Sequence, residues 1–534
     1  MMIFYNGKIY TGKGRFAEAF AVGGGRFVSV GSSDEVFSSV SGEYESIDLN
    51  GRFVCAGFND SHMHLLNFGQ SLLSAKLNEH TGSLKEVVDC MKAHLEKFPP
   101  EKDAWLKGRG WNQDYFKDVS RMPDRYDLDS VSSEIPVMIT RACGHCCVVN
   151  SKALEICGID SSTVSPDGGS VGITGGEPDG RLYDNAMDLV FCHMPVPDKE
   201  AIKQMILLAS KELNSYGITS VQTDDYCVFR SVPYNTVNEA YRELADEGKL
   251  FVRVYEQCNF TDIDRLRDFV KAGNHTGKGD CMFRIGPLKL LGDGALGSRT
   301  AHLSKHYLND PANFGFSLFS KEKLNELISY AHSIGMQIAV HSIGDACLDN
   351  VLDAFENALA VHPKNDHRHG IVHCQITRAD QLDRMLRLGL HIYAQTIFLD
   401  FDNHIVEKLV EPELVKTSYS FKTLYDGGAC VSNGSDCPVE LPDVMKGIEC
   451  AVTRTSIDGT GPYLPDESLT VSEALDTFTV NSAYASFEEN VKGMIKEGML
   501  ADFVVLSSDP FSAKPREIHL IKASETYLGG ERVR

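Results

Sequence analysis

The feature that most constrains this chain is an alternation of apolar, β-rich runs with amphipathic helical stretches through its middle portion. This alternation is typical of a parallel sheet covered by helices, because strands buried on both faces are apolar throughout. Candidate strands occupy residues 53–58, 218–223, 251–257, 285–291, 337–341, 370–374, 391–396 and 430–435. Since eight strands close a (β/α)8 barrel, the sequence predicts a TIM-like barrel of the α/β class.

The two ends of the chain have a different pattern from the middle. Residues 1–55 consist of short strand-like runs separated by Asn-Gly and Gly-Gly turn signals, and residues 493–534 continue in the same style. Chain termini often lie close together in space. We therefore expect a composite β-sandwich domain built from residues 1–55 plus 493–534, with the barrel in residues 56–492 between its two halves.

One gap between the candidate strands is too long for a simple βα unit. Roughly 150 residues separate the first two strands, whereas a whole βαβ crossover needs only tens of residues. We therefore expect an insertion after the first barrel strand, at about residues 75–215. A long insertion at this place suits a lid over the barrel mouth.

Charge and hydropathy narrow the range of partners. The 52 basic and 74 acidic side chains give a net charge of −22, which disfavours nucleic-acid backbones and anionic membranes. No apolar stretch approaches the ~20 residues that a membrane-spanning helix needs, and the N-terminus lacks the features of a secretory signal. We expect a cytoplasmic protein that acts on a small-molecule substrate. The sequence leaves open whether the chain forms a homo-oligomer.

The cysteines give little evidence for a structural metal site. Fifteen cysteines in a chain without an export signal are expected to be reduced and mostly buried thiols. The closest cluster is Cys143 with Cys146 and Cys147, but no second ligand pair follows it at the spacing of a structural zinc site.

Histidine and aspartate side chains gather at the ends of the predicted strands. His62 and His64 follow the first strand two residues apart, so on an extended chain they project to the same face. His341, His373 and Asp436 end later strands, where the residues of barrel active sites gather. Four imidazoles and a carboxylate favour zinc or another borderline divalent metal. Packing or solvent contact, the usual role of a single histidine, is expected for His332, His362, His367 and His391.

Lys289 lies inside an otherwise apolar strand that is aimed at the barrel interior. Burying an ammonium group is costly unless something pairs with it or neutralises it. One interpretation is a salt bridge to a nearby acid such as Asp293. The other is carboxylation, which turns the lysine into an oxygen ligand able to bridge two metal ions.

Several stretches resemble the signatures of the amidohydrolase superfamily and, within it, of amidohydrolase family 3, the YtcJ-like enzymes. The resemblance implies a distorted (β/α)8 barrel, a β-sandwich from both termini and a centre of one or two divalent ions, most readily zinc. It also implies the metal ligands His62, His64, Lys289, His341, His373 and Asp436. The stretches are residues 57–64, 108–112, 144–145, 149–154, 293–300, 434–436 with 438–439, 451–454 and 498–506.

At several positions the sequence departs from the usual pattern of this family. Cys437 stands where these enzymes commonly carry a tryptophan, and Cys143 precedes His145 where a polar residue is more usual. Gly370 and Val372 replace a frequent arginine and glutamate before the sixth-strand histidine. None of these changes removes a metal ligand, so they indicate a substrate pocket of different shape and polarity.

The hypothesis for function is hydrolysis of an amide-type C–N bond, other than a peptide bond, by a metal-activated water. Asp436 acts as general base and then acid, beside the metal-holding His373, and His145 is a candidate donor to the oxyanion. Arg299, Trp111 and Glu177 are weaker candidates for substrate contact. The alternatives are a lactone or ester hydrolase, a deaminase on the same scaffold, or a catalytically inactive barrel that binds a partner.

Overall fold

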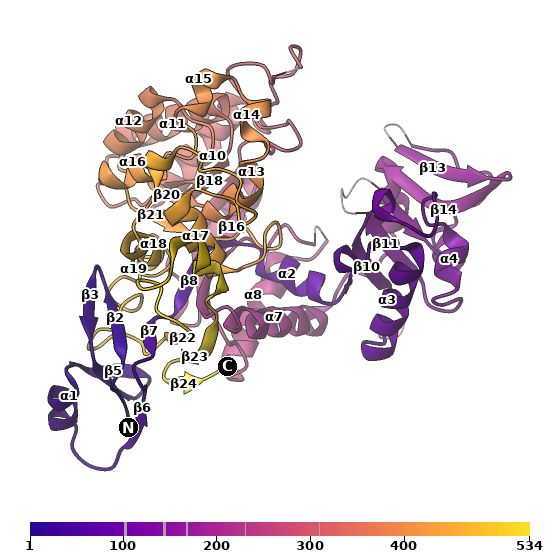
Figure 1. Cartoon of the computed structure of the whole chain (residues 1–534). Coiled ribbons are helices and arrows are strands. Elements are labelled where there is room, and N and C mark those ends of the chain that lie inside the picture. Colours follow the sequence, from indigo (N-terminus) through magenta and orange to yellow (C-terminus); the bar gives the residue numbers. More distant parts are fainter. Residues whose placement is uncertain (101–103, 142–145, 167–168, 230, 309) are drawn as a thin grey trace. The chain divides into compact units, whose positions relative to one another are not determined.

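The computed structural model describes residues 1–534 except 101–103, 142–145, 167–168, 230 and 309 (Figure 1). The chain divides into two compact units, one formed by residues 1–68 with 206–534 and the other by residues 69–205. Each unit has its own sheets and its own hydrophobic core, and each is described by itself.

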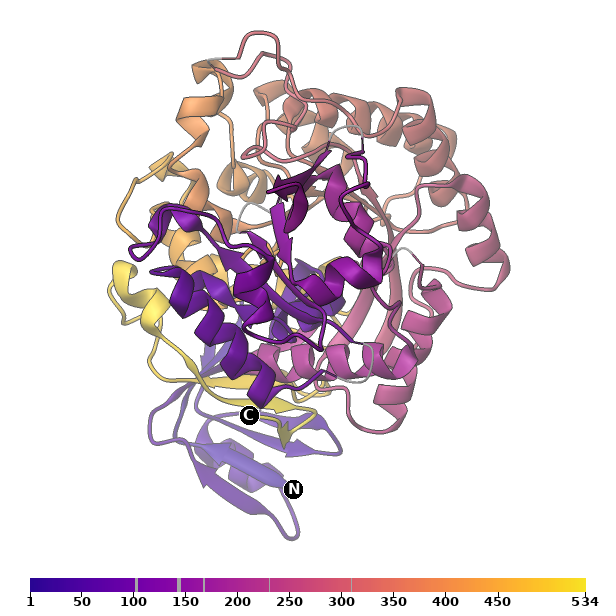
Figure 2. The same cartoon turned by 90° about the vertical axis from the view of Figure 1, so that its right-hand side faces the viewer.

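The larger unit is built on a parallel eight-stranded sheet in which successive strands along the chain are neighbours. With its covering helices, this sheet forms the predicted distorted (β/α)8 barrel of the α/β class (Figure 2). Its strands are β8 (Phe58–Met63), β15 (Ile218–Thr223), β16 (Arg253–Asn259), β17 (Phe283–Leu291), β18 (Ile338–Ser342), β19 (Gly370–His373), β20 (His391–Ala394) and β21 (Val431–Asn433).

The helices that accompany these strands bury one apolar face, and two of them show the side-chain caps that the sequence supplies at their starts. Asp262 accepts backbone hydrogen bonds at the start of one helix, and Ser320 does so at the start of the next. Leu324, Leu327 and Ile328 repeat at helical spacing and are buried. The helices are α7 (Lys199–Asn214), α8 (Tyr234–Asp246), α9 (Ile263–Lys271), α10 (Lys321–Ser333), α11 (Asp345–Val361), α12 (Ala379–Leu388), α16 (Phe421–Asp426), α17 (Val444–Thr453), α18 (Val471–Thr477) and α19 (Val480–Ala485). Among the described residues, none of the helices is long and apolar enough to span a bilayer.

The prediction of the first barrel strand at residues 53–58 is wrong. These residues belong to two strands, because β7 (Phe53–Ala56) pairs with strands from both chain ends, whereas β8 begins only at Phe58. At Gly57 between them, a Cβ atom would lie 2.3 Å from Thr219 Oγ1. The chain passes from one sheet to the other at this glycine. The apolar run is continuous across it, so the sequence does not mark the change.

Two small sheets share one hydrophobic core; the N-terminal segment alone forms one of them, and strands from both chain ends form the other. Phe4, Phe20 and Phe27 from the N-terminal segment pack there with Phe503 and Tyr527 from the C-terminal segment. The rings of Phe503 and Tyr527 are stacked at 4.3 Å. One sheet contains β5 (Arg26–Gly31), β4 (Ala19–Gly23), β1 (Met2–Tyr5) and β6 (Glu45–Asp48), and the other contains β24 (Glu531–Arg532), β23 (Ala523–Leu528), β22 (Phe503–Leu506), β7, β2 (Lys8–Gly12) and β3 (Arg15–Ala17).

The smaller unit has a six-stranded mixed sheet of its own. Its core contains Val87 and Met91 from one helix and Trp111, Ile139 and Val148 from three strands. The sheet order is β13 (Gly169–Thr174), β14 (Glu177–Asp184), β12 (Cys146–Val149), β11 (Val137–Arg141), β10 (Leu106–Trp111) and β9 (Ala75–Lys76), and the main helices are α3 (Leu84–Lys97), α4 (Arg125–Asp129) and α5 (Ser151–Cys157).

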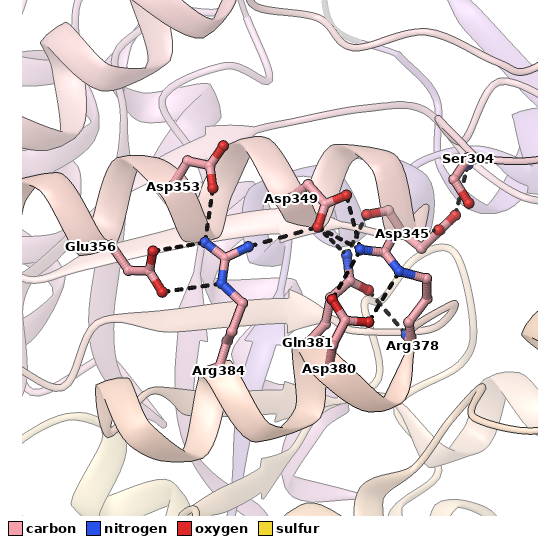
Figure 3. Close-up of polar contacts among 9 residues, drawn as sticks. All are labelled: Ser304, Asp345, Asp349, Asp353, Glu356, Arg378, Asp380, Gln381 and Arg384. Carbon is pink, nitrogen blue, oxygen red and sulfur yellow. Dashed lines mark hydrogen bonds and ion pairs between the residues drawn. The ribbon is translucent and has the colours of Figure 1, made fainter.

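A row of ion pairs joins α11 to α12 on the outside of the barrel (Figure 3). Arg378 lies 2.8 Å from the carboxylates of Asp345 and Asp349. Six residues further along the chain, Arg384 pairs with Asp353 at 2.8 Å and with Glu356 at 2.9 Å. The carboxylate of Asp345 is fully buried, whereas those of Asp353 and Glu356 are exposed. Arg378 therefore pairs with a buried carboxylate, whereas the carboxylates of Asp353 and Glu356 that pair with Arg384 are exposed.

Replacement of Arg378 by alanine is expected to lower the free energy of unfolding by about 1–3 kcal/mol, because the buried carboxylate of Asp345 loses its cation. Arg384→Ala is the matched control on the same helix and is expected to cost only ~0–1 kcal/mol, because its partners face solvent. Urea unfolding of the two variants measures the difference. Equal losses would contradict the distinction between the two pairs.

Candidate metal centre

Three predicted site residues from three strand ends converge at one point in the barrel. His62 from β8, His373 from the end of β19 and Asp436 just after β21 are buried, and their possible ligand atoms all lie within 4.8 Å of one another. Asp436 Oδ1 lies 3.3 Å from His62 Nε2 and 3.1 Å from His64 Nε2. The first-strand pair thus faces the eighth-strand aspartate.

The other ring nitrogen of each of these histidines is held by a hydrogen bond. His62 Nδ1 donates to Gln257 Oε1 at 2.9 Å, and His373 Nδ1 donates to Gln395 Oε1 at 2.8 Å. His64 Nδ1 donates to the backbone oxygen of Asp224 at 3.2 Å. Because a neutral imidazole carries one proton, these bonds leave the Nε2 lone pairs of His62 and His373 free for the site.

His341 and Lys289 border this cluster. The rings of His341 and His373 lie 4.5 Å apart, and His341 Nε2 donates to the backbone oxygen of Gly294 at 3.0 Å. That bond leaves Nδ1 as the ring nitrogen of His341 with a free lone pair. Lys289 is fully buried and its Nζ lies 3.5 Å from His62 Nε2. The structure therefore brings all six predicted metal-site residues into one region.

Lys289 does not pair with Asp293, the example of a nearby acidic partner that the sequence offers. Its Nζ lies 3.6 Å from Asp224 Oδ2, and both side chains are fully buried. Asp293 instead accepts hydrogen bonds from the backbone nitrogens of Ile343 and Gly344. Side chains that point into a barrel meet across alternate strands, which explains why a residue at the end of β15 reaches a lysine on β17.

The backbone is strained where two of these residues are held. His373 has a φ of 74° and Asp436 a φ of 58°, both in the left-handed region. Non-glycine residues in this region cost of order 1–3 kcal/mol and persist only where their surroundings fix them, most often at functional sites. The nitrogen of Asp436 donates to the backbone oxygen of His62 at 2.8 Å, which supplies such a restraint.

The pKa values of the cluster residues indicate which of them are charged. Burial lowers the pKa of His62 to about 4, and nearby Lys289 adds to this effect. Burial also favours the neutral form of His64, but its hydrogen bond to Asp436 and the charges of Asp436 and Asp224 raise its pKa to about 9. Burial opposes ionisation of Asp436, yet the hydrogen bond that His64 donates holds its pKa well below the usual range. Asp436 is therefore an anion, and His62 is a neutral base.

This arrangement fits a divalent cation. The lone pair of His62 Nε2 faces the Asp436 carboxylate at 3.3 Å, so two electron-rich atoms meet in a buried site. A cation between such atoms turns their repulsion into attraction. Imidazole nitrogens with a carboxylate oxygen are the donors that zinc and similar metals prefer.

None of the remaining candidates that the structure describes belongs to the cluster. His145 and Cys143 lie outside the described residues. Trp111 is fully buried in the core of the smaller unit, and Arg299 and Glu177 are exposed. The burial of Trp111 agrees with a packing role, and the exposure of Arg299 and Glu177 agrees with a surface role.

Several other histidines fill structural positions near the opposite ends of the barrel strands. His369 Nδ1 accepts from the nitrogen of Ile338, so its Nε2 donates to His332 Nδ1 at 2.8 Å. His391, at the start of β20, lies 2.7 Å from Ser432 Oγ through its Nε2. His332, His367 and His391 are buried, and His362 is exposed, in keeping with packing and solvent roles.

The buried, neutral state of His391 predicts a loss of stability in acid. Burial lowers its pKa to about 3, so below about pH 6.5 the unfolded chain takes up a proton that the folded chain does not. Stability that is complete above pH 6.5 is then lost by up to about 1.4 kcal/mol per pH unit. Chemical unfolding of wild type and His391→Asn should show their difference moving against wild type as the pH falls. A difference independent of pH would contradict the prediction.

Four polar residues around the cluster were not singled out from the sequence. Gln257 and Gln395 bind the site histidines, Asp224 pairs with Lys289, and Asp60 lies two residues before His62. Each is a buried polar residue at or near the carboxyl end of a barrel strand. A polar residue near the carboxyl end of a predicted barrel strand is the sequence feature that could have identified these four residues.

Comparisons with known proteins agree with this geometry. A model described as "Amidohydrolase family" matches residues 45–534. The chain is 34% identical to the putative amidohydrolase YtcJ of Bacillus subtilis strain 168, over 99% of this chain and 98% of that protein. It is 27% identical to an N-substituted formamide deformylase of Arthrobacter pascens, over 99% of this chain and 97% of that protein. The crystal structure of an uncharacterised metal-dependent hydrolase from Pyrococcus horikoshii OT3 matches with a TM-score of 0.80 and 28% identity, over 96% of this chain and 99% of that one.

Proposed function

We propose that this chain, a metal-dependent hydrolase of the amidohydrolase family, cleaves an amide-type C–N bond in a small molecule. The proposed bond is not a peptide bond. The observation that carries the proposal is the buried convergence of His62, His373 and Asp436 at the carboxyl ends of the barrel strands. The bond type is supported by the full-length similarity to a protein named as a formamide deformylase.

The proposed metal ligands are the residues that surround this point. His62 and His373 offer Nε2, His341 offers Nδ1, and Asp436 offers Oδ1, while His64 faces the same carboxylate oxygen. We propose zinc as the ion, because imidazoles outnumber oxygen donors in this set. When bound, the ion supplies Lewis-acid chemistry, in that it polarises a carbonyl oxygen and lowers the pKa of water to about 7.

Asp436 is the proposed proton carrier. Its carboxylate is mostly buried and ionised, and it lies at the point where the three strand ends meet. A carboxylate placed there accepts a proton from the attacking water and returns it to the leaving nitrogen, within hydrogen-bond reach of both. The hydrogen bond with His64 Nε2, at 3.1 Å, keeps the carboxylate oriented.

Lys289 decides how many ions the centre holds. As an ammonium group it pairs with Asp224, as the contact of 3.6 Å describes, and one ion is expected. As a carbamate its oxygens would lie beside His62 and join two ions. Metal loading with and without bicarbonate separates these forms: a second equivalent that appears only with bicarbonate supports carboxylation, and a single equivalent in both supports the ion pair.

Product analysis tests the bond type. The purified, zinc-loaded chain is assayed against matched N-acyl amines, formamides and cyclic amides, and against the esters and lactones of the same acids. Release of amine or ring opening at nitrogen, lost in the Asp436→Asn variant, supports the proposal. Turnover confined to the oxygen analogues, or ammonia released from amino-substituted rings alone, contradicts it.

A further inference from the structure

The barrel sheet has a seam that runs through the proposed metal centre. Among the described residues, β21 and β8 are the two edges of the strand order and have no ladder between them. Beyond their ends the chain crosses the seam by backbone hydrogen bonds, from Asp436 to His62 and from His64 to Cys437, both of 2.8 Å. The proposed ligands His62 and His64 lie on one side of this seam, and Asp436 lies on the other. The spacing of the centre therefore depends on how the seam is closed.

The carboxylate of Asp60 lies in this seam and bonds to both sides. It is fully buried. From the β21 side, Ser435 donates its backbone nitrogen to both carboxylate oxygens at 3.1 Å and its Oγ to Oδ2 at 2.5 Å. On its own strand, Asp60 Oδ1 accepts from the nitrogen of His62 at 3.2 Å. One side chain thus holds the residue before Asp436 and the backbone of His62.

The hydrogen bonds continue from Asp60 to the turn that carries Asp436. Ser435 Oγ donates to Asp60 and accepts from the nitrogen of Cys437 at 3.1 Å. These two bonds enclose Asp436, whose φ of 58° is otherwise unfavourable. At Gly434, a Cβ would lie 2.6 Å from the nitrogen of His62 and 2.7 Å from Asp60 Oδ1, so the turn passes against the carboxylate with no room for a side chain.

We propose that Asp60 is a positioning residue of the metal centre, whose carboxylate fastens the β21 end to β8 and so fixes the distance of Asp436 from His62 and His64. This role rests on the proposed function, because it takes these three residues as ligands. A carboxylate with only a structural role would affect stability and leave the metal affinity unchanged. Residues that orient metal ligands through hydrogen bonds typically change metal affinity 10- to 100-fold when replaced.

The test is the Asp60→Asn variant, which keeps the shape but replaces one acceptor oxygen by a donor that faces the donors of Ser435. Competition with a zinc chelator is expected to show a roughly 10- to 100-fold lower affinity for zinc. In the metal-free protein, hydrogen exchange at the amides of Asp436 and His64 is expected to be faster, because these two amides make the seam bonds. Neither readout requires turnover.

Asp476→Asn is the matched control. Asp476 is also a buried aspartate that accepts one hydroxyl and one backbone nitrogen, from Tyr10 at 2.9 Å and Lys13 at 3.1 Å. These two hydrogen bonds lead to the N-terminal segment and not to Asp60 or Ser435. The control is expected to bind zinc with wild-type affinity and to leave exchange at Asp436 unchanged.

Ser435→Ala is a milder second variant, because it removes only the Oγ bond and keeps the backbone bonds to Asp60. A several-fold loss of zinc affinity is expected, and this variant decides the question if Asp60→Asn does not fold. If the wild type binds zinc and the folded variants bind it equally well, the role of Asp60 is overturned while the proposed function stands. If the wild type takes up no zinc, the proposed function is overturned and this role with it.

Discussion

Replacement of Asp436 by asparagine is expected to lower kcat by about a hundred- to ten-thousand-fold, the range over which a positioned general base contributes. The amide keeps the shape of the side chain but cannot accept the proton of the attacking water. His62, His341 and His373 remain in place, so the variant is expected to retain most of its metal. Steady-state kinetics on the zinc-loaded variant, with metal content measured on the same sample, test this expectation.

The two measurements together identify the cause of any loss. Low activity with metal retained supports the role of Asp436 in proton transfer, whereas low activity with metal lost indicates that Asp436 acts mainly as a ligand. Full activity in Asp436→Asn would remove Asp436 from the mechanism.

Replacement of Lys289 by methionine is expected to lower the free energy of unfolding by about 3–5 kcal/mol, because it leaves a fully buried carboxylate without its cation. Methionine fills similar space, so the loss reports charge more than packing. Chemical unfolding is measured on metal-free protein, since a bound ion would add its own linkage to stability.

The double variant Lys289→Met with Asp224→Asn is the control for this interpretation. If the loss comes from the unpaired Asp224 carboxylate, removing that charge should restore a large part of the stability. A double variant as unstable as the sum of the two single variants would contradict a direct pair between Lys289 and Asp224.

The regular part of the fold could be predicted because local patterns determine it. The strand predicted at residues 218–223 has the bounds of β15, since Gly217 precedes a short run with β-branched residues that ends before Asp224. The first strand was wrong because the apolar run at residues 53–58 continues through Gly57, where the chain leaves one sheet for another. Apolar residues are needed in both sheets, so hydropathy alone cannot mark that change.

The candidate site could be predicted to the extent that strand ends concentrate functional side chains. The two-residue spacing of His62 and His64 indicated that both face the site. The positions of His341, His373 and Asp436 at the ends of strands indicated the same for them. The partners that orient them could not be predicted, because contacts such as that between His62 and Gln257 join residues 195 positions apart. Such pairing depends on the barrel closing.

Lys289 illustrates the same limit. Asp293 was an example of an acidic partner because it is near in sequence, but the chain turns after β17 and carries that carboxylate to the backbone of Ile343 and Gly344. The true neighbour, Asp224, stands two strands away in the sheet. Proximity in sequence is a poor guide inside a barrel, where inward side chains from alternate strands share a layer.

The most direct test of the account is the metal content of the carefully purified chain, with hydrolysis measured before and after chelation. The account predicts about one or two equivalents of zinc or a similar divalent metal per chain, with activity lost on chelation and regained on zinc addition. A chain that holds no metal, and takes up none when zinc, manganese or iron is supplied, would contradict the proposed ligand set.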